Sequence, residues 1–237
     1  DTTPEGEQVN IYGNHVGSWN FAATAYLNRW KVKIYYEHYF DDHSQMFFQY
    51  GRWKDGHIGL EITFPKNRFI DTFVYEGLGT KDQTGPMLYD SFWGKFEEQI
   101  SAKDNYYNHY LYQGWQHWGM GIGNPLLPGP IYNKNGQITF ISNRVLAHHI
   151  GFCGSPCQSL SYRMLLSYSR HWGTYDNPLN EIKKQFNSLF EVTYAPQQLT
   201  GWSFTVSGAM DRGSILGNNY GGMLVIRKQG IIKSGNK

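Results

Sequence analysis

The sequence predicts an all-β fold of antiparallel strands, and three observations lead to this prediction. The first is strict alternation within 30–39, where Trp30 and Ile34 fall on one side of an extended strand and Lys31 and Lys33 fall on the other. The second is that similar apolar alternation recurs along the chain between turn residues. The third is composition, because only 17% of the residues are charged, below the ~25% of typical soluble domains.

The strands are recognised mainly from large apolar residues at every second position, as with Ile58, Leu60 and Ile62. The expected strands are, in order, 16–27, 30–39, 57–64, 68–78, 137–151, 160–170, 187–195, 201–211 and 220–228. Other clear one-sided sets are Trp19, Phe21, Ala23, Ala25 and Leu27; Tyr162, Met164, Leu166 and Tyr168; Phe190, Val192 and Tyr194; and Trp202, Phe204, Val206 and Met210. Segment 79–136 lacks strand periodicity, and a weak pattern within it allows a short helix near 90–101.

The connections between these strands alternate in length. Tight turns are expected at 28–29, 65–67, 152–159 and 196–200, and long or polar links at 40–56, 79–136, 171–186 and 212–219. Outer-membrane β-barrels combine short turns at one end with long loops at the other. The sequence therefore predicts a single domain over 1–237, an antiparallel outer-membrane β-barrel or a large portion of one, with long surface or lumen loops. A soluble β-sandwich shows the same alternation within a strand and stays an alternative.

Charge and hydropathy narrow the classes of function. The formal net charge is +2 and the basic residues are scattered, so no nucleic-acid partner is expected. No apolar run approaches the ~18 residues of a transmembrane helix. In a barrel wall, the charged strand faces must look inward, since a Lys or Arg facing mid-membrane lipid costs about 2–4 kcal/mol.

Motifs of catalysis and of metal binding are weak. Nucleotide-binding glycine patterns, the GxSxG motif and HExxH are absent from the sequence. His38 and His43 lie near Asp41 and Asp42, but a solvated loop explains this group better than a metal site. Glu97-Glu98 is interpreted as surface charge, because neighbouring side chains diverge. We therefore expect no enzyme, no cofactor and no metal.

The two cysteines, Cys153 and Cys157, enclose Gly-Ser-Pro. A tight turn at these residues would bring the thiols together, and a disulfide would indicate an oxidising compartment. Three intervening residues can also strain such a bridge, so the sequence leaves open a disulfide or two free thiols.

Aromatic residues interleaved with amides and imidazoles suggest contact with sugars. Flat rings match the apolar faces of sugars, while amide and imidazole groups bond to hydroxyls. The candidate polysaccharide-binding residues are Tyr106, Tyr107, His109, Tyr112, Trp115, His117, Trp118, Trp172, Tyr175 and Asp176. Loops folded into a barrel lumen would need the same aromatic filler, so a structural role stays open.

Four long runs of the chain resemble capsule assembly proteins of the Wzi family, in the versions found in Bacteroidetes. They are YYEHYFDDHSQMFFQYGRWKDG (35–56), ITFPKNRFI (62–70), YNHYLYQGWQHWGMGIGNPLL (107–127) and HWGTYDNPL (171–179). The resemblance implies an outer-membrane β-barrel of a Gram-negative bacterium, in contact with membrane lipid, whose surface loops bind and anchor capsular polysaccharide without catalysis. Members of that family are considerably longer, so the chain is expected to correspond to the C-terminal part of such a barrel.

Two other classes of function remain alternatives at this point. One is an outer-membrane porin or oligosaccharide channel. The other is a soluble β-sandwich domain that binds or hydrolyses glycans.

Overall fold

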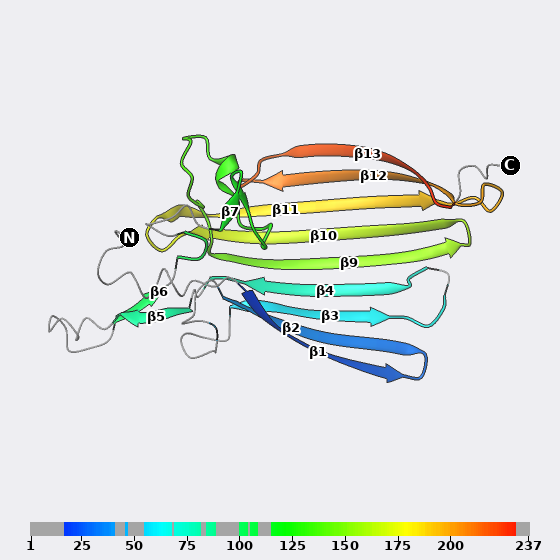
Figure 1. Ribbon diagram of the computed structural model, residues 1–237, viewed down its shortest axis with the longest axis horizontal. Helices are drawn as coiled ribbons and strands as arrows, with labels where there is room; N and C mark the ends of the chain where they lie inside the picture. Colours follow the sequence, from blue (N-terminus) through cyan, green and yellow to red (C-terminus); the bar gives the residue numbers. More distant parts are fainter. Residues whose placement is uncertain are drawn as a thin grey trace, which may run out of the picture.

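A single large antiparallel sheet dominates the computed structural model, which describes residues 17–40, 46, 55–67, 69–81, 84–88, 100–103, 105–108 and 115–230 (Figure 1). The order of its nine strands is β1-β2-β3-β4-β9-β10-β11-β12-β13. Their bounds are Gly17–Leu27, Trp30–Phe40, Gly56–Thr63, Thr72–Gly79, Val145–Cys157, Leu160–Gly173, Pro178–Tyr194, Trp202–Gly213 and Asn219–Lys228. Every neighbouring pair is antiparallel, and the neighbours farthest apart in the sequence are β4 and β9, which are joined through 80–144.

Among the described residues, two small two-stranded sheets and a short helix accompany the large sheet. Strands β5 (Thr84–Leu88) and β6 (Ile100–Lys103) pair with each other, as do β7 (Gln116–His117) and β8 (Met120–Gly121). A 3₁₀ helix, η2, covers Pro130–Tyr132. Within the described ranges, no helix is long and apolar enough to span a membrane.

The prediction of an all-β antiparallel fold is confirmed, and each expected strand overlaps one strand of the large sheet. In the part of the chain that the structure describes, β1 and β13 form the two edges and do not pair with each other, so this sheet is open. Closure into a barrel stays a prediction. The short helix allowed near 90–101 lies mostly outside the described residues, and its last two positions belong to β6.

The connections gather at opposite ends of the sheet, as expected for a meander of antiparallel strands (Figure 1). The turn end, as we call it, carries 28–29, 64–71, 158–159 and 195–201. The loop end carries 41–55, 80–144, 174–177 and 214–218. The predicted long link 171–186 is wrong, because β10 extends to Gly173 and β11 begins at Pro178. The polar start of β11 extends beyond the alternating segment and therefore gave no strand signal.

The turn predicted at 152–159 is also wrong in extent. Strand β9 runs through Cys157, and a register shift opposite Leu160 and Tyr162 marks a β-bulge near its end. Bulges accept proline, which explains how Pro156 lies within a strand. Gly154 is required there for a close approach, since an added Cβ would lie 1.8 Å from the carbonyl oxygen of Phe69.

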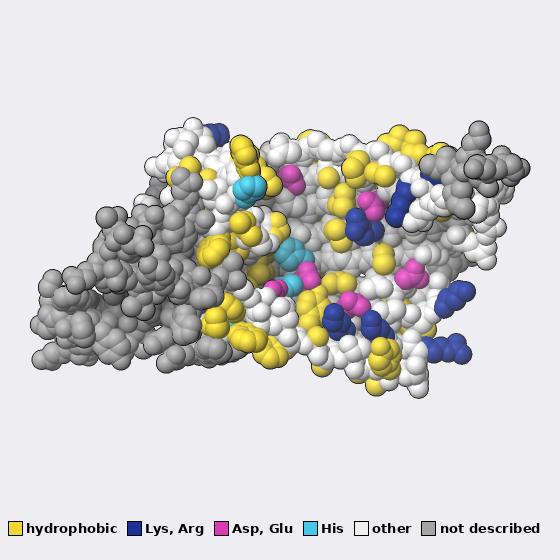
Figure 2. All heavy atoms as spheres, in the orientation of Figure 1, with side chains coloured by type: hydrophobic (Ala, Val, Ile, Leu, Met, Phe, Trp, Pro, Cys, Tyr) yellow, Lys and Arg dark blue, Asp and Glu magenta, His cyan; other side chains and the backbone are white. Residues whose placement is uncertain are grey.

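The register sorts side chains onto two contrasting faces. The apolar face carries large hydrophobic residues whose exposed fractions stay high, such as 55% for Ile34, 61% for Val206 and 65% for Leu224. Aromatic residues mark its ends, with Trp19 toward the loop end and Trp30 packed against Phe64 at 5.0 Å at the turn end. The polar face carries most of the charged residues of the strands and is the one seen in Figure 2.

The core is small and lies at the loop end. Leu127 and Phe140, from the segment between β8 and β9, pack with Val145 and Ala147 of β9. Leu78 and Ala147 are cross-strand partners on the polar face. The segment therefore covers part of the polar face near the loop end. Among the described residues, large side chains in the middle of the apolar face stay exposed, as at Ile34, Val206 and Leu224.

Candidate functional site

One row of polar residues crosses the polar face from strand to strand. In register, Glu76 of β4 lies opposite His149 of β9, which lies opposite Ser167 of β10. His149 Nδ1 and the Ser167 hydroxyl are hydrogen-bonded at 2.7 Å. The row continues through Asn187 to Asp211, where the Asn187 amide donates to the carboxylate at 2.6 Å. Side chains from five adjacent strands thus share one row, and Gly59 of β3 lies next to Glu76 at its end.

Gly59 permits a long-range contact within this row. The ring of Tyr35 lies over this glycine, and an added Cβ would be 2.0 Å from the ring. The Tyr35 hydroxyl then reaches across β3 and donates to the Glu76 carboxylate. A side chain at position 59 would displace the tyrosine from this position.

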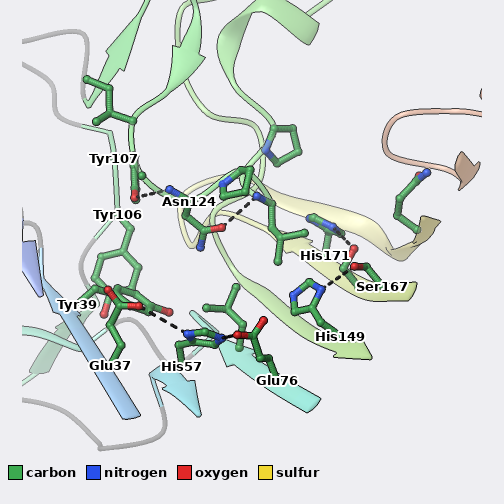
Figure 3. A pocket seen from close by; sticks show the side chains of 18 of the residues that line it. Glu37, Tyr39, His57, Glu76, Tyr106, Tyr107, Asn124, His149, Ser167 and His171 are labelled. Carbon is green, nitrogen blue, oxygen red and sulfur yellow. Dashed lines mark hydrogen bonds and ion pairs between the residues drawn. The ribbon is translucent and has the colours of Figure 1, made fainter. Parts of the chain in front are cut away.

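A pocket of about 800 Å³ lies at the loop end of the polar face, above this row (Figure 3). On one wall, His57 stands between two carboxylates, with Nδ1 3.6 Å from Glu37 and Nε2 3.5 Å from Glu76. On the other side, His149 and His171 line the pocket from β9 and β10. Pairs of hydrogen-bonding groups on adjacent strands therefore form the floor.

The opposite wall comes from two segments: Tyr106 and Tyr107 between β6 and β7, and the residues between β8 and β9 that carry the small core. The backbone N–H of Asn124 donates to the Tyr107 hydroxyl at 3.3 Å, and Tyr107 packs against Phe140 at 5.3 Å. Tyr106 is almost fully buried and donates to the Asp55 carboxylate at 3.1 Å. These contacts fix the aromatic wall of the pocket in place.

His171 is buried at the edge of the pocket between two hydroxyls. Its Nε2 is 2.9 Å from Ser169 Oγ and its Nδ1 is 3.4 Å from Ser142 Oγ. Both ring nitrogens therefore have partners, which suits a role in holding segment 142–144 against β10.

The pocket offers carboxylates, imidazoles, hydroxyls, amides and tyrosine rings, which suits a neutral polyhydroxyl ligand. Among the residues that the structure describes, no group of three or more His, Cys, Asp or Glu side chains is arranged to hold a metal ion. His43, Asp41 and Asp42, which the sequence analysis assigned to a solvated loop, lie outside the described residues, as do Glu97 and Glu98.

Among the predicted sugar-binding residues that the structure describes, Tyr106 and Tyr107 line this pocket and the others do not. Trp115, His117 and Trp118 belong to the β7–β8 hairpin, where Trp118 is 84% exposed and contacts the His117 ring edge-on. His109 and Tyr112 lie outside the described residues.

The remaining three predicted residues lie at the loop end near Arg144. The Lys81 Nζ lies 5.0 Å from the centroid of the Trp172 ring, and the Arg144 guanidinium lies 3.8 Å from the centroid of the Tyr175 ring. Asp176 accepts a hydrogen bond from Asn105 at 3.1 Å. The structure thus places the predicted set in at least three separate places.

Sequence reasoning missed the pocket residues that come from strands: Glu37, His57, Glu76, His149 and Ser167. Their signal was present as polar residues at inward positions of alternating segments. His148 and His149 are adjacent on β9 and point to opposite faces, so that His148 bonds to Tyr75 on the apolar face while His149 lines the pocket.

Cys153 and Cys157 are free thiols. Both lie on β9, and four residues of strand span about 13 Å, well beyond the ~7 Å limit between bonded cysteines. The disulfide alternative is therefore wrong for this structure, because the tight turn that it required is a continuing strand.

No family model, no curated protein and no solved structure matches this chain.

Proposed function

We propose that the protein is an outer-membrane β-barrel, or a large part of one, that binds capsular polysaccharide at the cell surface of a Gram-negative bacterium without chemically changing it. The observation that carries this proposal concerns the described residues: a large sheet whose apolar face keeps its middle rows exposed and whose polar face holds an aromatic-polar pocket. The Wzi resemblance of the sequence agrees with it.

The apolar face supports a lipid environment. Across the middle rows of the described strands, this face carries no Asp, Glu, Lys or Arg. Its members include Phe21, Ile34, Leu60, Ile62, Phe73, Ile150, Phe152, Met164, Phe190, Val206 and Leu224. Exposed apolar patches of soluble monomers rarely exceed a few hundred Å², whereas this face extends over nine strands. An apolar band between aromatic ends is the pattern of a lipid-facing barrel wall.

The pocket supports polysaccharide binding. It lies at the loop end, which faces outward in outer-membrane barrels. Tyr39, Tyr107 and Tyr132 line it beside Glu37 and Asn124. Each sugar unit would gain only a few such contacts, so affinity would depend on many repeats of one polymer engaging many copies of the protein.

An outer-membrane channel is the second candidate function, and experiment can distinguish it from a binding protein. The segment between β8 and β9 covers part of the polar face at the loop end, which favours a binding site over an open passage. Ion conductance in planar bilayers would favour the channel. A soluble sandwich is less favoured, since the described residues contain no second large sheet opposite the apolar face.

The test is binding of purified capsular polysaccharide to the detergent-solubilised protein and to three variants. Tyr132→Ala removes a 60% exposed ring of the pocket and is expected to weaken binding about tenfold. Trp202→Ala, at the turn end, is the matched control and is expected to bind normally. Trp118→Ala tests the exposed hairpin.

Normal binding by Tyr132→Ala together with loss of binding by Trp118→Ala would move the site to the hairpin. Release of the protein from membranes without detergent would contradict the membrane assignment. Cleavage of the polysaccharide would contradict the non-catalytic assignment.

A further inference from the structure

Three cations gather on the apolar face at its loop end, on three neighbouring strands. Arg170 of β10 and Lys184 of β11 are direct cross-strand partners. Arg212 of β12 lies opposite Phe186, one step along the same face, and is therefore a diagonal neighbour of Lys184. We name Arg170, Lys184 and Arg212 the basic belt.

Like charges directly opposite each other on a sheet are destabilising. Two cations of the polar face do pair with carboxylates, in Arg163–Glu191 at 3.4 Å and Lys31–Glu61 at 3.6 Å. Within the residues that the structure describes, no carboxylate makes an ion pair with a member of the basic belt. The belt therefore lacks the charge balance seen on the polar face.

An aromatic residue and a further cation extend the belt. The centroid of the Trp172 ring lies 5.3 Å from the Arg170 guanidinium and 5.0 Å from the Lys81 Nζ. Tryptophan is enriched where a membrane-spanning surface meets the headgroups. The belt follows immediately on the aromatic pair Tyr168–Phe186 of the same face, so it lies where an aromatic row ends the apolar band. In a membrane, that is the level where hydrocarbon gives way to headgroups.

Resting on the proposed membrane location, we propose that the basic belt binds the phosphate groups of an anionic lipid in the leaflet at the loop end. In an outer membrane that lipid is lipid A. Its acyl chains would cover the apolar rows below the belt, and its phosphates would supply the negative charge between Arg170 and Lys184. Arginine suits this role because its planar donors match phosphate oxygens.

The experiment compares two double variants that change net charge equally. Lys184→Gln with Arg212→Gln removes two belt cations, whereas Lys31→Gln with Lys33→Gln removes two cations of the polar face. Binding of lipid A to the full chain is measured in detergent micelles, with inorganic phosphate as competitor. Insertion into pure phosphatidylcholine vesicles is measured separately, by resistance to alkaline extraction.

We expect the belt variant to bind lipid A about tenfold or more weakly and to lose the salt dependence of binding. The polar-face variant is expected to bind as the parent does, and inorganic phosphate is expected to compete poorly because it lacks acyl chains. Equal loss in both variants, or full displacement by inorganic phosphate, would overturn the proposal. If the parent inserts into vesicles but binds lipid A no more tightly than the belt variant does, only this inference fails. If the parent does not insert, the proposed function fails with it.

Discussion

The two faces of the sheet differ in how their charged side chains are arranged. On the polar face, basic and acidic side chains lie near one another (Figure 2) and pair across strands, as with Lys31 and Glu61. Hydrogen bonds such as His149–Ser167 also join neighbouring strands there (Figure 3). On the apolar face, charge is absent from the middle rows, and the cations at the loop end are grouped together.

This difference shows what each face is built to contact. Paired charges and hydrogen-bonded rows suit a crowded surface beside water. A polar group that its neighbours shield from the water there needs a hydrogen-bonding partner in the protein. A broad uncharged band suits a medium that cannot solvate charge. Three predictions test this contrast.

The largest effect is expected from a charge placed in the middle of the apolar face. Ile34→Lys should lower the free energy of unfolding in lipid vesicles by about 2–4 kcal/mol, because the ammonium would meet hydrocarbon. Urea titration of the vesicle-inserted protein measures this. The control is Asn20→Lys, on the polar face of β1 and opposite Glu37, which should be nearly neutral.

Ile34 is 55% exposed in the isolated chain, so a soluble protein would tolerate lysine there. A neutral result for Ile34→Lys would therefore contradict the lipid-facing interpretation.

An intermediate effect is expected at Gly59, where the polar row requires a residue without a side chain. Gly59→Ala places a Cβ against the Tyr35 ring and should destabilise the fold by about 1–3 kcal/mol. Gly208→Ala is the matched control on β12, since an added Cβ there meets no atom within 4 Å. Thermal unfolding in detergent compares the two variants.

If crowding by Tyr35 is the cause, adding Tyr35→Ala to Gly59→Ala should restore part of the lost stability. Equal destabilisation by Gly59→Ala and Gly208→Ala would instead indicate a general intolerance of strand alanines.

The smallest effect is expected from one ion pair of the polar face. Glu191→Gln should change the free energy of unfolding by less than about 1 kcal/mol, because Arg163 is half exposed and water screens the pair. A double-mutant cycle with Arg163→Met isolates the coupling between the two side chains. A coupling of several kcal/mol would mean that this part of the polar face is shielded from water.

Much of the fold could be predicted from the sequence, because strand alternation is a local property. The segment 201–211 predicted β12 (Trp202–Gly213) closely, since its apolar and polar residues sort by period alone. Strand β11 was predicted too short because its first residues, including Lys183 and Lys184, place polar side chains on both faces. The strand predicted over 137–151 ended too early for β9, because Gly154 and Pro156 indicated a turn and a β-bulge uses the same residues.

The candidate site could be predicted only in part. Tyr106 and Tyr107 were selected for their chemistry and do line the pocket. Trp118 was selected on the same grounds but extends from the β7–β8 hairpin outside the pocket. Composition shows which side chains suit a sugar, but it does not show which of them converge.

The sequence by itself determined that the chain forms strands with one apolar and one polar face, because each residue's side follows from its position in an alternating run. Only the tertiary structure decided that β4 pairs with β9 across 80–144, so that Glu76 meets His149. It also decided the register of β10 and β11, which places Arg170 opposite Lys184. The physical reason is that register depends on hydrogen bonds between distant strands, whereas alternation depends on the backbone of one strand alone.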